Sequence, residues 1–348
     1  MRFASDNRAG VCPEVLDALV DEASRSGPAY GEDDATAQVT DLLAEILEHE
    51  VWAYPVLTGT AANSLALASL CDPWGGVLCS DVAHVLVDEC GAPEFFGGGL
   101  RLIPLVSPDG RIDPLAVAEA IDGAGEHDVH NTPIQALTLT NLSETGAAYR
   151  AAETAALCRL AHDRGLSVHL DGARLANAVI GTGESIADLT WRAGVDIVSF
   201  GGTKNGAAAA EVVVCFDDRL AEQLERRRKR AGQLLSKMRL VSTQLTAQLR
   251  DGVWLAHAAH ANQMASRLAT ELGRTPGIEL VGHVDGNELF VSVDPDRAAA
   301  WRDAGAEFYD SPSGNHRLVR LVTSWSTTQE EVDQFAEMAS DAQLGPIS

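Results

Sequence analysis

Two short apolar segments, each followed by a turn with an ionisable residue, constrain the fold of this chain more than any other feature. They span residues 166–171 and 195–200, and a glycine-rich turn covers 201–206. The residues between the two segments are typical of a helix, so the pattern predicts two strands of one open sheet in an α/β protein. The carboxyl ends of such strands meet at a crevice where ligands bind. We therefore expect Asp171 and Lys204 to project into the same crevice.

This pair of side chains meets two needs of one cofactor, pyridoxal phosphate. The cofactor requires a lysine that forms a Schiff base, a carboxylate that keeps its pyridine nitrogen protonated, and backbone donors for its phosphate. Lys204 could provide the first and Asp171 the second. Taken alone, however, a lysine after glycines and an aspartate before a glycine are both common in ordinary turns.

A helix start that could bind phosphate is the third feature. Thr58, Gly59 and Thr60 follow an apolar run and lead into a helical stretch. The N-terminus of a helix presents unpaired N–H groups and a favourable dipole to an anion. A hydroxyl from Ser199 or Thr203 could assist. Because Thr-Gly-Thr is also a common link between a strand and a helix, the hypothesis depends on the order of all three features.

Longer motifs around these residues resemble a known family. Residues 169–178 read His-Leu-Asp-Gly-Ala-Arg-Leu-Ala-Asn-Ala, and residues 199–206 read Ser-Phe-Gly-Gly-Thr-Lys-Asn-Gly. Further matches in the same order cover nearly the whole chain, at 5–7, 30–33, 58–63, 83–84, 143–146 and 319–323. Together these motifs resemble the low-specificity L-threonine aldolases, fold type I pyridoxal-phosphate enzymes of the aromatic amino acid β-eliminating lyase/threonine aldolase group.

The resemblance implies roles for residues that the pattern alone leaves open. His84 would lie over the pyridine ring, and His130 would be a second histidine of the pocket. Tyr30 would belong to the substrate pocket. Arg230 and Arg239 would reach the cofactor phosphate, if need be across a subunit boundary.

The implied reaction is the cleavage of a β-hydroxy-α-amino acid, such as threonine or allo-threonine, to glycine and an aldehyde. Arg174 and Arg320, with Ser5, would hold the α-carboxylate, a task that suits the bidentate geometry of guanidinium. His84, with His130 as a helper, would take the β-hydroxyl proton. Transamination and β-elimination would use the same lysine and aspartate, so both stay open, as does a binding protein without catalysis.

Composition argues against several other classes of protein. A net charge of −24 disfavours nucleic acid and anionic membranes as partners. No apolar run approaches the ~20 residues of a membrane helix, and no signal-peptide pattern opens the chain, so the cytoplasm is the expected compartment. Six cysteines without a C-x-x-C pair argue against a zinc site or a disulfide framework. We therefore expect no metal.

The chain is too long for one typical core, so we expect two domains. A cofactor-binding domain with a mostly parallel central sheet would cover 1–250, and a small α+β domain would cover 251–348. Strands are predicted at 51–57, 76–79, 101–106, 135–141, 211–216, 278–281, 288–293 and 318–323, besides the two organising ones. Helices are predicted at 13–23, 36–49, 61–70, 114–121, 151–164, 220–249, 251–272 and 329–342.

We also expect a homo-oligomer. A cofactor site that is completed by a basic segment of another protomer requires at least a dimer, and two-fold symmetry is the common solution. The resemblance implies a dimer of dimers. The basic run at 226–230 would serve this site, or would simply form a solvated helix face.

Overall fold

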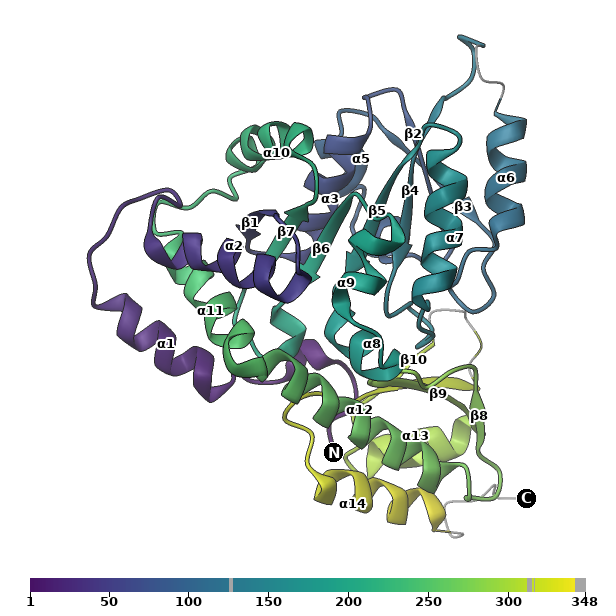
Figure 1. Ribbon diagram of the computed structural model, residues 1–348. Coiled ribbons are helices and arrows are strands. Elements are labelled where there is room, and N and C mark those ends of the chain that lie inside the picture. The colour runs from purple at the N-terminus through teal and green to yellow at the C-terminus, as the bar shows by residue number, and fades with distance from the viewer. Residues whose placement is uncertain (125–127, 312–314, 316, 342–348) are drawn as a thin grey trace.

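The computed structural model describes residues 1–124, 128–311, 315 and 317–341, and its strands form two sheets. Figure 1 shows the larger sheet with helices packed around it and, below it, the smaller sheet with α12, α13 and α14. Each sheet has its own buried apolar core. This arrangement matches the expected α/β fold with a smaller α+β part.

The larger sheet has seven strands in the order β1-β7-β6-β5-β4-β2-β3. Their bounds are β1 Trp52–Val56, β2 Gly76–Ser80, β3 Arg101–Leu105, β4 Ile134–Thr140, β5 Ser167–Gly172, β6 Ile197–Gly201 and β7 Glu211–Cys215. Strands β2, β3, β4, β5 and β6 pair in parallel, whereas β7 runs antiparallel to both of its neighbours, β6 and β1. Every residue of β2, β6 and β7 is buried, as expected for a sheet covered on both faces. The predicted mostly parallel sheet is confirmed.

Eleven α-helices of the described chain lie before or around this sheet. They are α1 Pro13–Ala23, α2 Asp34–Leu47, α3 Gly59–Leu70, α4 His84–Val87, α5 Ala92–Phe96, α6 Pro114–Gly123, α7 Ala151–His162, α8 Leu175–Thr182, α9 Ile186–Leu189, α10 Asp218–Arg230 and α11 Arg239–Leu249. The predicted helix at 13–23 is confirmed to the residue, and Pro13 occupies the first position, which suits its fixed φ. Helix α3 is buried almost all round, as its small and apolar residues require.

The predicted helix at 220–249 is wrong, because the structure has two helices there. Helix α10 ends at Arg230 and α11 begins at Arg239. Gly232 lies between them with φ of 73°, a left-handed conformation that cannot continue a right-handed helix and that glycine adopts at low cost. The chain therefore turns at Gly232, and the charged and the amphipathic halves of the predicted helix separate.

The smaller sheet is antiparallel, with the order β10-β11-β9-β8. Its strands are β8 Glu279–Val281, β9 Glu288–Ser292, β10 Tyr309–Asp310 and β11 Leu318–Val322, and its helices are α12 Val253–Leu272, α13 Pro295–Asp303 and α14 Gln329–Ser340. The sequence did not predict α13 or β10. The helix predicted at 329–342 is present as α14, and its expected last residue lies outside the described residues.

Two segments connect the two cores. Helix α12 contributes Trp254 and Ala258 to the larger core, and Leu268 and Leu272 to the smaller one. The segment before α1 contributes Phe3, which is fully buried in the smaller core. The boundary at residues 250 and 251 stays our proposal, with the addition that the first residues pack with the second unit.

Phe3 is also held by its backbone. Its N–H donates to the carbonyl of Glu307 at 2.8 Å, and its carbonyl accepts from the N–H of Val322, also at 2.8 Å.

Across the residues that the structure describes, no helix combines the length and the apolar character that crossing a membrane would need.

Candidate active site

A cleft of ≈ 510 Å³ opens where the strands of the larger sheet end. Residues at or just after the carboxyl ends of β1, β2, β4, β5 and β6 line it, and Glu211 reaches the same edge because β7 is antiparallel. Its polar lining consists of Asn7, Thr58, Thr60, Asn63, His84, Asp88, Glu89, Thr140, Glu144, Asp171, Arg174, Ser199, Thr203, Lys204 and Glu211. Asp171, in β5, and Lys204, in the turn after β6, therefore face one cavity.

Asp171 is fixed by two donors near the end of β5. Its Oδ2 accepts from Nδ2 of Asn63 at 2.8 Å, and its Oδ1 accepts from the N–H of Ala173 at 3.0 Å. The side chain is buried, with 4% of the residue exposed. Because both donors hold the carboxylate in place, it is oriented before any ligand enters the cleft.

Lys204 lies in a 3₁₀ turn, Thr203–Asn205, directly after β6. Gln248 holds this turn, since its Nε2 donates to the carbonyls of Gly202 and Asn205 at 3.0 Å each. The sequence contains two other lysines, Lys229 and Lys237, and both are exposed and outside the cleft lining. Lys204 is therefore the lysine that can bind a ligand in this cleft.

The start of α3 forms one wall of the cleft. Thr58 caps the helix, because its Oγ1 accepts from the N–H of Ala61 at 3.1 Å. The next N–H groups, those of Gly59 and Thr60, belong to the first turn of the helix, where no helical carbonyl is available to them. A Cβ at Gly59 would meet nothing within 4 Å, so space for an anion lies in front of this turn.

These groups fit pyridoxal phosphate. Lys204 offers an amine, Asp171 a fixed carboxylate, and the N-terminus of α3 a set of N–H donors, all in one cavity. A buried carboxyl oxygen points to the same conclusion: Oε2 of Glu144, a residue of the cleft wall, has no hydrogen-bond partner within the described structure. An orphaned acceptor of this kind calls for a donor from a bound ligand.

His84 begins α4 and also lines the cleft, and the buried Glu89 orients it. Its Nδ1 lies 2.9 Å from Oε1 of Glu89, which also accepts from Nδ2 of Asn63 at 2.8 Å. The hydrogen bond with Glu89 raises the pKa of His84, although burial acts in the opposite direction. With Nδ1–H donating to Glu89, Nε2 carries the lone pair and can accept a proton. Asn63 thus joins the Asp171 and His84 sides of the cleft.

Two further acids of the cleft, the half-buried Glu144 and the buried Glu211, have pKa values raised toward neutral pH. Burial, with a contribution from Asp171, raises the pKa of Glu144 to about 7, and its Oε1 accepts from the N–H of His84 at 2.8 Å. Burial likewise raises the pKa of Glu211 to about 7, while Lys204 and the N–H of Gly202 lower it. Both carboxyl groups can therefore hold or release a proton near neutral pH.

An ion-pair cluster closes the cleft on the side of the smaller sheet. Arg174 donates through Nε and Nη2 to Asp6 at 2.7 and 3.1 Å, and its Nη1 lies 3.5 Å from Oε2 of Glu288. Nε of Arg320 lies 3.4 Å from the other oxygen of Glu288. Burial alone would raise the pKa of Asp6, but the charges of Arg174 and Lys204 outweigh it and the pKa is lowered. Both arginines thus form long ion pairs with Glu288, and Arg174 also lines the cleft.

The structure places His130 outside the cleft of its own chain, and its role as a second histidine of the pocket stays a proposal. His130 is exposed and lines a second hollow together with Arg101, at the amino ends of β3 and β4. The physical reason is its position just before β4. A residue that precedes a strand of a parallel sheet lies at the edge opposite the carboxyl ends.

Five other predicted residues also lie outside the cleft lining, and one of them is Arg320, which faces Glu288. Tyr30 is exposed, and Lys229 lies 4.3 Å from the centre of its ring. Arg230 is exposed at the end of α10. Arg239 is buried and pairs with Glu22 at 3.1 Å. These three side chains stay proposals for a site that another protomer completes. Ser5 is a local cap whose Oγ accepts from the N–H of Asn7, and Asn7 itself lines the cleft.

No sequence pattern points to Glu89 or Glu211 as site residues, and Asn63 is only one position of the motif at 58–63. A single acid in a sequence carries no sign that it will be buried. For Asn63 a signal existed, because a polar residue on the otherwise apolar α3 should have a buried partner.

A mostly parallel sheet with this cleft at its carboxyl edge, together with the small antiparallel unit, defines a fold type I pyridoxal-phosphate enzyme. The family model described as beta-eliminating lyase matches residues 2–295. The chain belongs to this beta-eliminating lyase family.

Individual relatives agree with this assignment. The chain is 40% identical over 335 residues to a low specificity L-threonine aldolase of Pseudomonas sp. (strain NCIMB 10558), and the aligned residues cover 96% of each chain. It is 38% identical over 343 residues to the low specificity L-threonine aldolase of Pseudomonas aeruginosa, and the aligned residues cover 99% of this chain and 97% of that one. Among solved structures, threonine aldolase of Leishmania major is similar with a TM-score of 0.91 at 26% identity, over 97% of this chain and 98% of that one.

Proposed function

We propose that the protein is a pyridoxal-phosphate-dependent aldolase that cleaves L-threonine, L-allo-threonine and related β-hydroxy-α-amino acids to glycine and an aldehyde. The observation that carries the proposal is that Lys204, Asp171 and the start of α3 line one cavity. The Pseudomonas aldolases, similar over nearly the whole chain, support the substrate class.

The cofactor would be held at three points. Lys204 would bind its aldehyde carbon through the amine, Asp171 would accept from its pyridine N–H, and the N–H groups of Gly59 and Thr60 would bind its phosphate. Hydroxyls of Ser199 and Thr203 line the same cavity. When bound, pyridoxal phosphate supplies a sink for the electron pair that the breaking Cα–Cβ bond releases.

The residues of the chain would orient the substrate and move its protons. Arg174 and Arg320, which face Glu288 at 3.5 and 3.4 Å, could turn a guanidinium edge to the substrate's α-carboxylate and so fix which Cα bond breaks. His84 would accept the β-hydroxyl proton at Nε2, since Glu89 occupies Nδ1. The β-carbon then leaves as the aldehyde carbonyl, and Cα takes up a proton to give glycine.

Incubation of the purified protein with pyridoxal phosphate and L-threonine tests the proposed function. We expect glycine and acetaldehyde in equal amounts, with the aldehyde measured by a coupled NADH-dependent alcohol dehydrogenase. Because the matching family model is described as beta-eliminating lyase, the protein should also be incubated with L-serine, and the formation of pyruvate and ammonia should be measured. Keto acid formation without aldehyde would replace the aldolase proposal by transamination or elimination.

The pH profile is expected to identify His84 as the base. In its neutral form His84 can accept a proton, so kcat/KM should rise as the pH passes through its pKa. The hydrogen bond with Glu89 raises that pKa, so Glu89→Gln should move this acid limb to lower pH. Asp88→Asn, at another acid of the cleft wall, should leave the limb in place. An unmoved limb in Glu89→Gln would exclude His84 as the titrating group.

We further propose a homo-oligomer, at least a dimer and by family likeness a dimer of dimers, in which Tyr30, Arg230 and Arg239 reach a neighbouring cleft. The exposed positions of Tyr30 and Arg230 support this arrangement, and the buried Arg239 contacts Glu22 and the carbonyl of Arg25, near the loop that carries Tyr30. The cytoplasm is the proposed compartment. All six cysteines are free and five of them are buried, which is typical of proteins in a reducing environment.

A further inference from the structure

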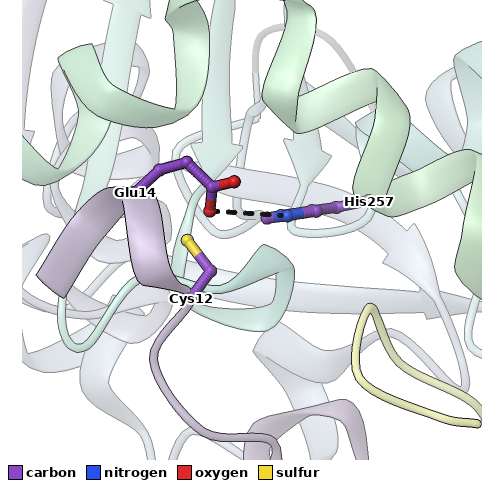
Figure 2. Close-up of side chains that lie close together, drawn as sticks. All are labelled: Cys12, Glu14 and His257. Carbon is purple, nitrogen blue, oxygen red and sulfur yellow. Dashed lines mark ion pairs between the residues drawn. The ribbon is translucent and has the colours of Figure 1, made fainter. Parts of the chain in front are cut away.

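Three potential metal ligands meet outside the cleft, on the far side of the turn that carries Lys204. Figure 2 shows Cys12 and Glu14, at the start of α1, facing the ring of His257 from α12. One donor atom from each side chain lies within 4.8 Å of the other two. The cysteine spacing gave no sign of this group, because its third member is distant in the sequence.

The ring of His257 is held in an orientation that suits a metal ligand. Its Nδ1 lies 3.0 Å from the carbonyl of Asn205 and must donate to it, so Nε2 carries the lone pair. Nε2 points at Glu14, whose Oε2 is 4.0 Å away. The ring also stacks on Trp325, with 5.2 Å between centroids and 29° between planes. A backbone carbonyl on the second nitrogen is the usual support for a metal-bound histidine.

Gly206 makes room for the group. It has φ of 112°, and a Cβ at this position would come within 3.2 Å of Sγ of Cys12 and 3.4 Å of Nδ1 of His257. The backbone of Cys12 is fixed as well, since its N–H donates to the carbonyl of Gly206 at 2.9 Å. The thiol is buried, whereas the Glu14 side chain is 46% exposed and free to adjust.

We propose that Cys12, Glu14 and His257 form a binding site for Zn²⁺, with the fourth position open to water. A thiolate, an imidazole and a carboxylate are all zinc ligands, and the mixture of sulfur and nitrogen argues against Mg²⁺ or Ca²⁺. Ligand atoms around tetrahedral zinc lie about 3.3–3.6 Å apart. A small rotation of the exposed Glu14 side chain would bring its oxygen from 4.0 Å to that distance from Nε2.

Binding exchanges one proton for the metal. A Zn–S bond forms as the S–H bond breaks, and the proton leaves to solvent. Affinity should therefore increase as the pH rises. A bound ion would tie α1 and α12 to the carbonyls of Asn205 and Gly206, and so brace the turn that holds Lys204.

Metal titration of the protein loaded with pyridoxal phosphate tests the site. With Co²⁺ as the probe, we expect one equivalent to produce a thiolate-to-cobalt charge-transfer band and the strong visible bands of tetrahedral cobalt. Zn²⁺ should displace it, and competition with a chromophoric chelator gives the zinc affinity. Cys12→Ser should remove the charge-transfer band, and Glu14→Gln, at an exposed position that the fold does not need, should weaken zinc binding more than about tenfold.

Cys90→Ser is the matched control, because Cys90 is an exposed thiol outside the cluster. It should keep both the cobalt band and the zinc affinity. Zinc should also raise the unfolding temperature of the wild type and of Cys90→Ser, and at the same zinc concentration it should raise that of Glu14→Gln by less. Zinc binding that is unchanged in both Cys12→Ser and Glu14→Gln would overturn the proposal, as would a cobalt complex without sulfur coordination.

Discussion

Replacing Lys204 with alanine is expected to lower kcat for threonine cleavage by at least about 10³-fold, because the side chain attaches the cofactor and no other lysine lines the cleft. The yellow colour of the lysine-bound cofactor should also be lost. After borohydride reduction of the wild type, mass spectrometry should find the cofactor on Lys204 alone. This single variant tests cofactor attachment and reaction together.

Lys237→Ala is the matched control, since Lys237 is an exposed lysine outside the cleft. It should keep the colour and the activity of the wild type. If Lys204→Ala retained both properties, or if the label were found on Lys229 or Lys237, the cleft would not be the cofactor site. Added primary amines that restore part of the activity of Lys204→Ala would support the assignment.

The second large effect is expected from Asp171→Asn, which should lower kcat by at least about a hundredfold while the cofactor stays attached to Lys204. The amide can still accept one hydrogen bond, but it carries no charge to keep the pyridine nitrogen protonated. The electron sink is then weakened, although the cavity keeps its shape. The measurement is steady-state threonine cleavage together with the absorption spectrum of the bound cofactor across pH.

Asp171→Glu separates charge from shape at this position. It keeps a carboxylate and should recover part of the activity that Asp171→Asn loses. The Asn63 amide, which donates to Asp171 at 2.8 Å, should hold the longer side chain less well, so full recovery is not expected. Equal activity in Asp171→Asn and the wild type would show that this carboxylate does not support the pyridine ring.

The sequence could predict those parts of the cleft that follow from strand direction. Asp171, Lys204 and Thr58 each come at or just after the end of an apolar strand, and parallel strands bring their carboxyl ends to one edge. The same rule explains the position of His130, which precedes its strand and so lies at the other edge of the sheet. Its role in a pocket came from the resemblance and stays a proposal.

Side chains whose role depends on burial could not be predicted in this way. Glu89, Glu144 and Glu211 look like ordinary surface acids in the sequence, and only the packing around the cleft buries Glu89 and Glu211 and partly buries Glu144. The raised pKa values of Glu144 and Glu211, and the hydrogen-bond partners of all three acids, are consequences of that packing. The turn at Gly232 was missed for a related reason, because helical periodicity continues on both sides of it.

The position of Phe3 has a consequence for how the chain is made. A ribosome releases the segment before α1 long before it releases β11, whose Val322 binds the carbonyl of Phe3. Until β11 has been made, Phe3 lacks its partner Val322. Until β9 has been made, the ion-pair cluster of Asp6 and Arg174 lacks Glu288. The cofactor cleft, which Asn7 helps to line, can therefore be completed only after β9 and β11 have been made. Newly made chains should gain the ability to bind pyridoxal phosphate only from that point on.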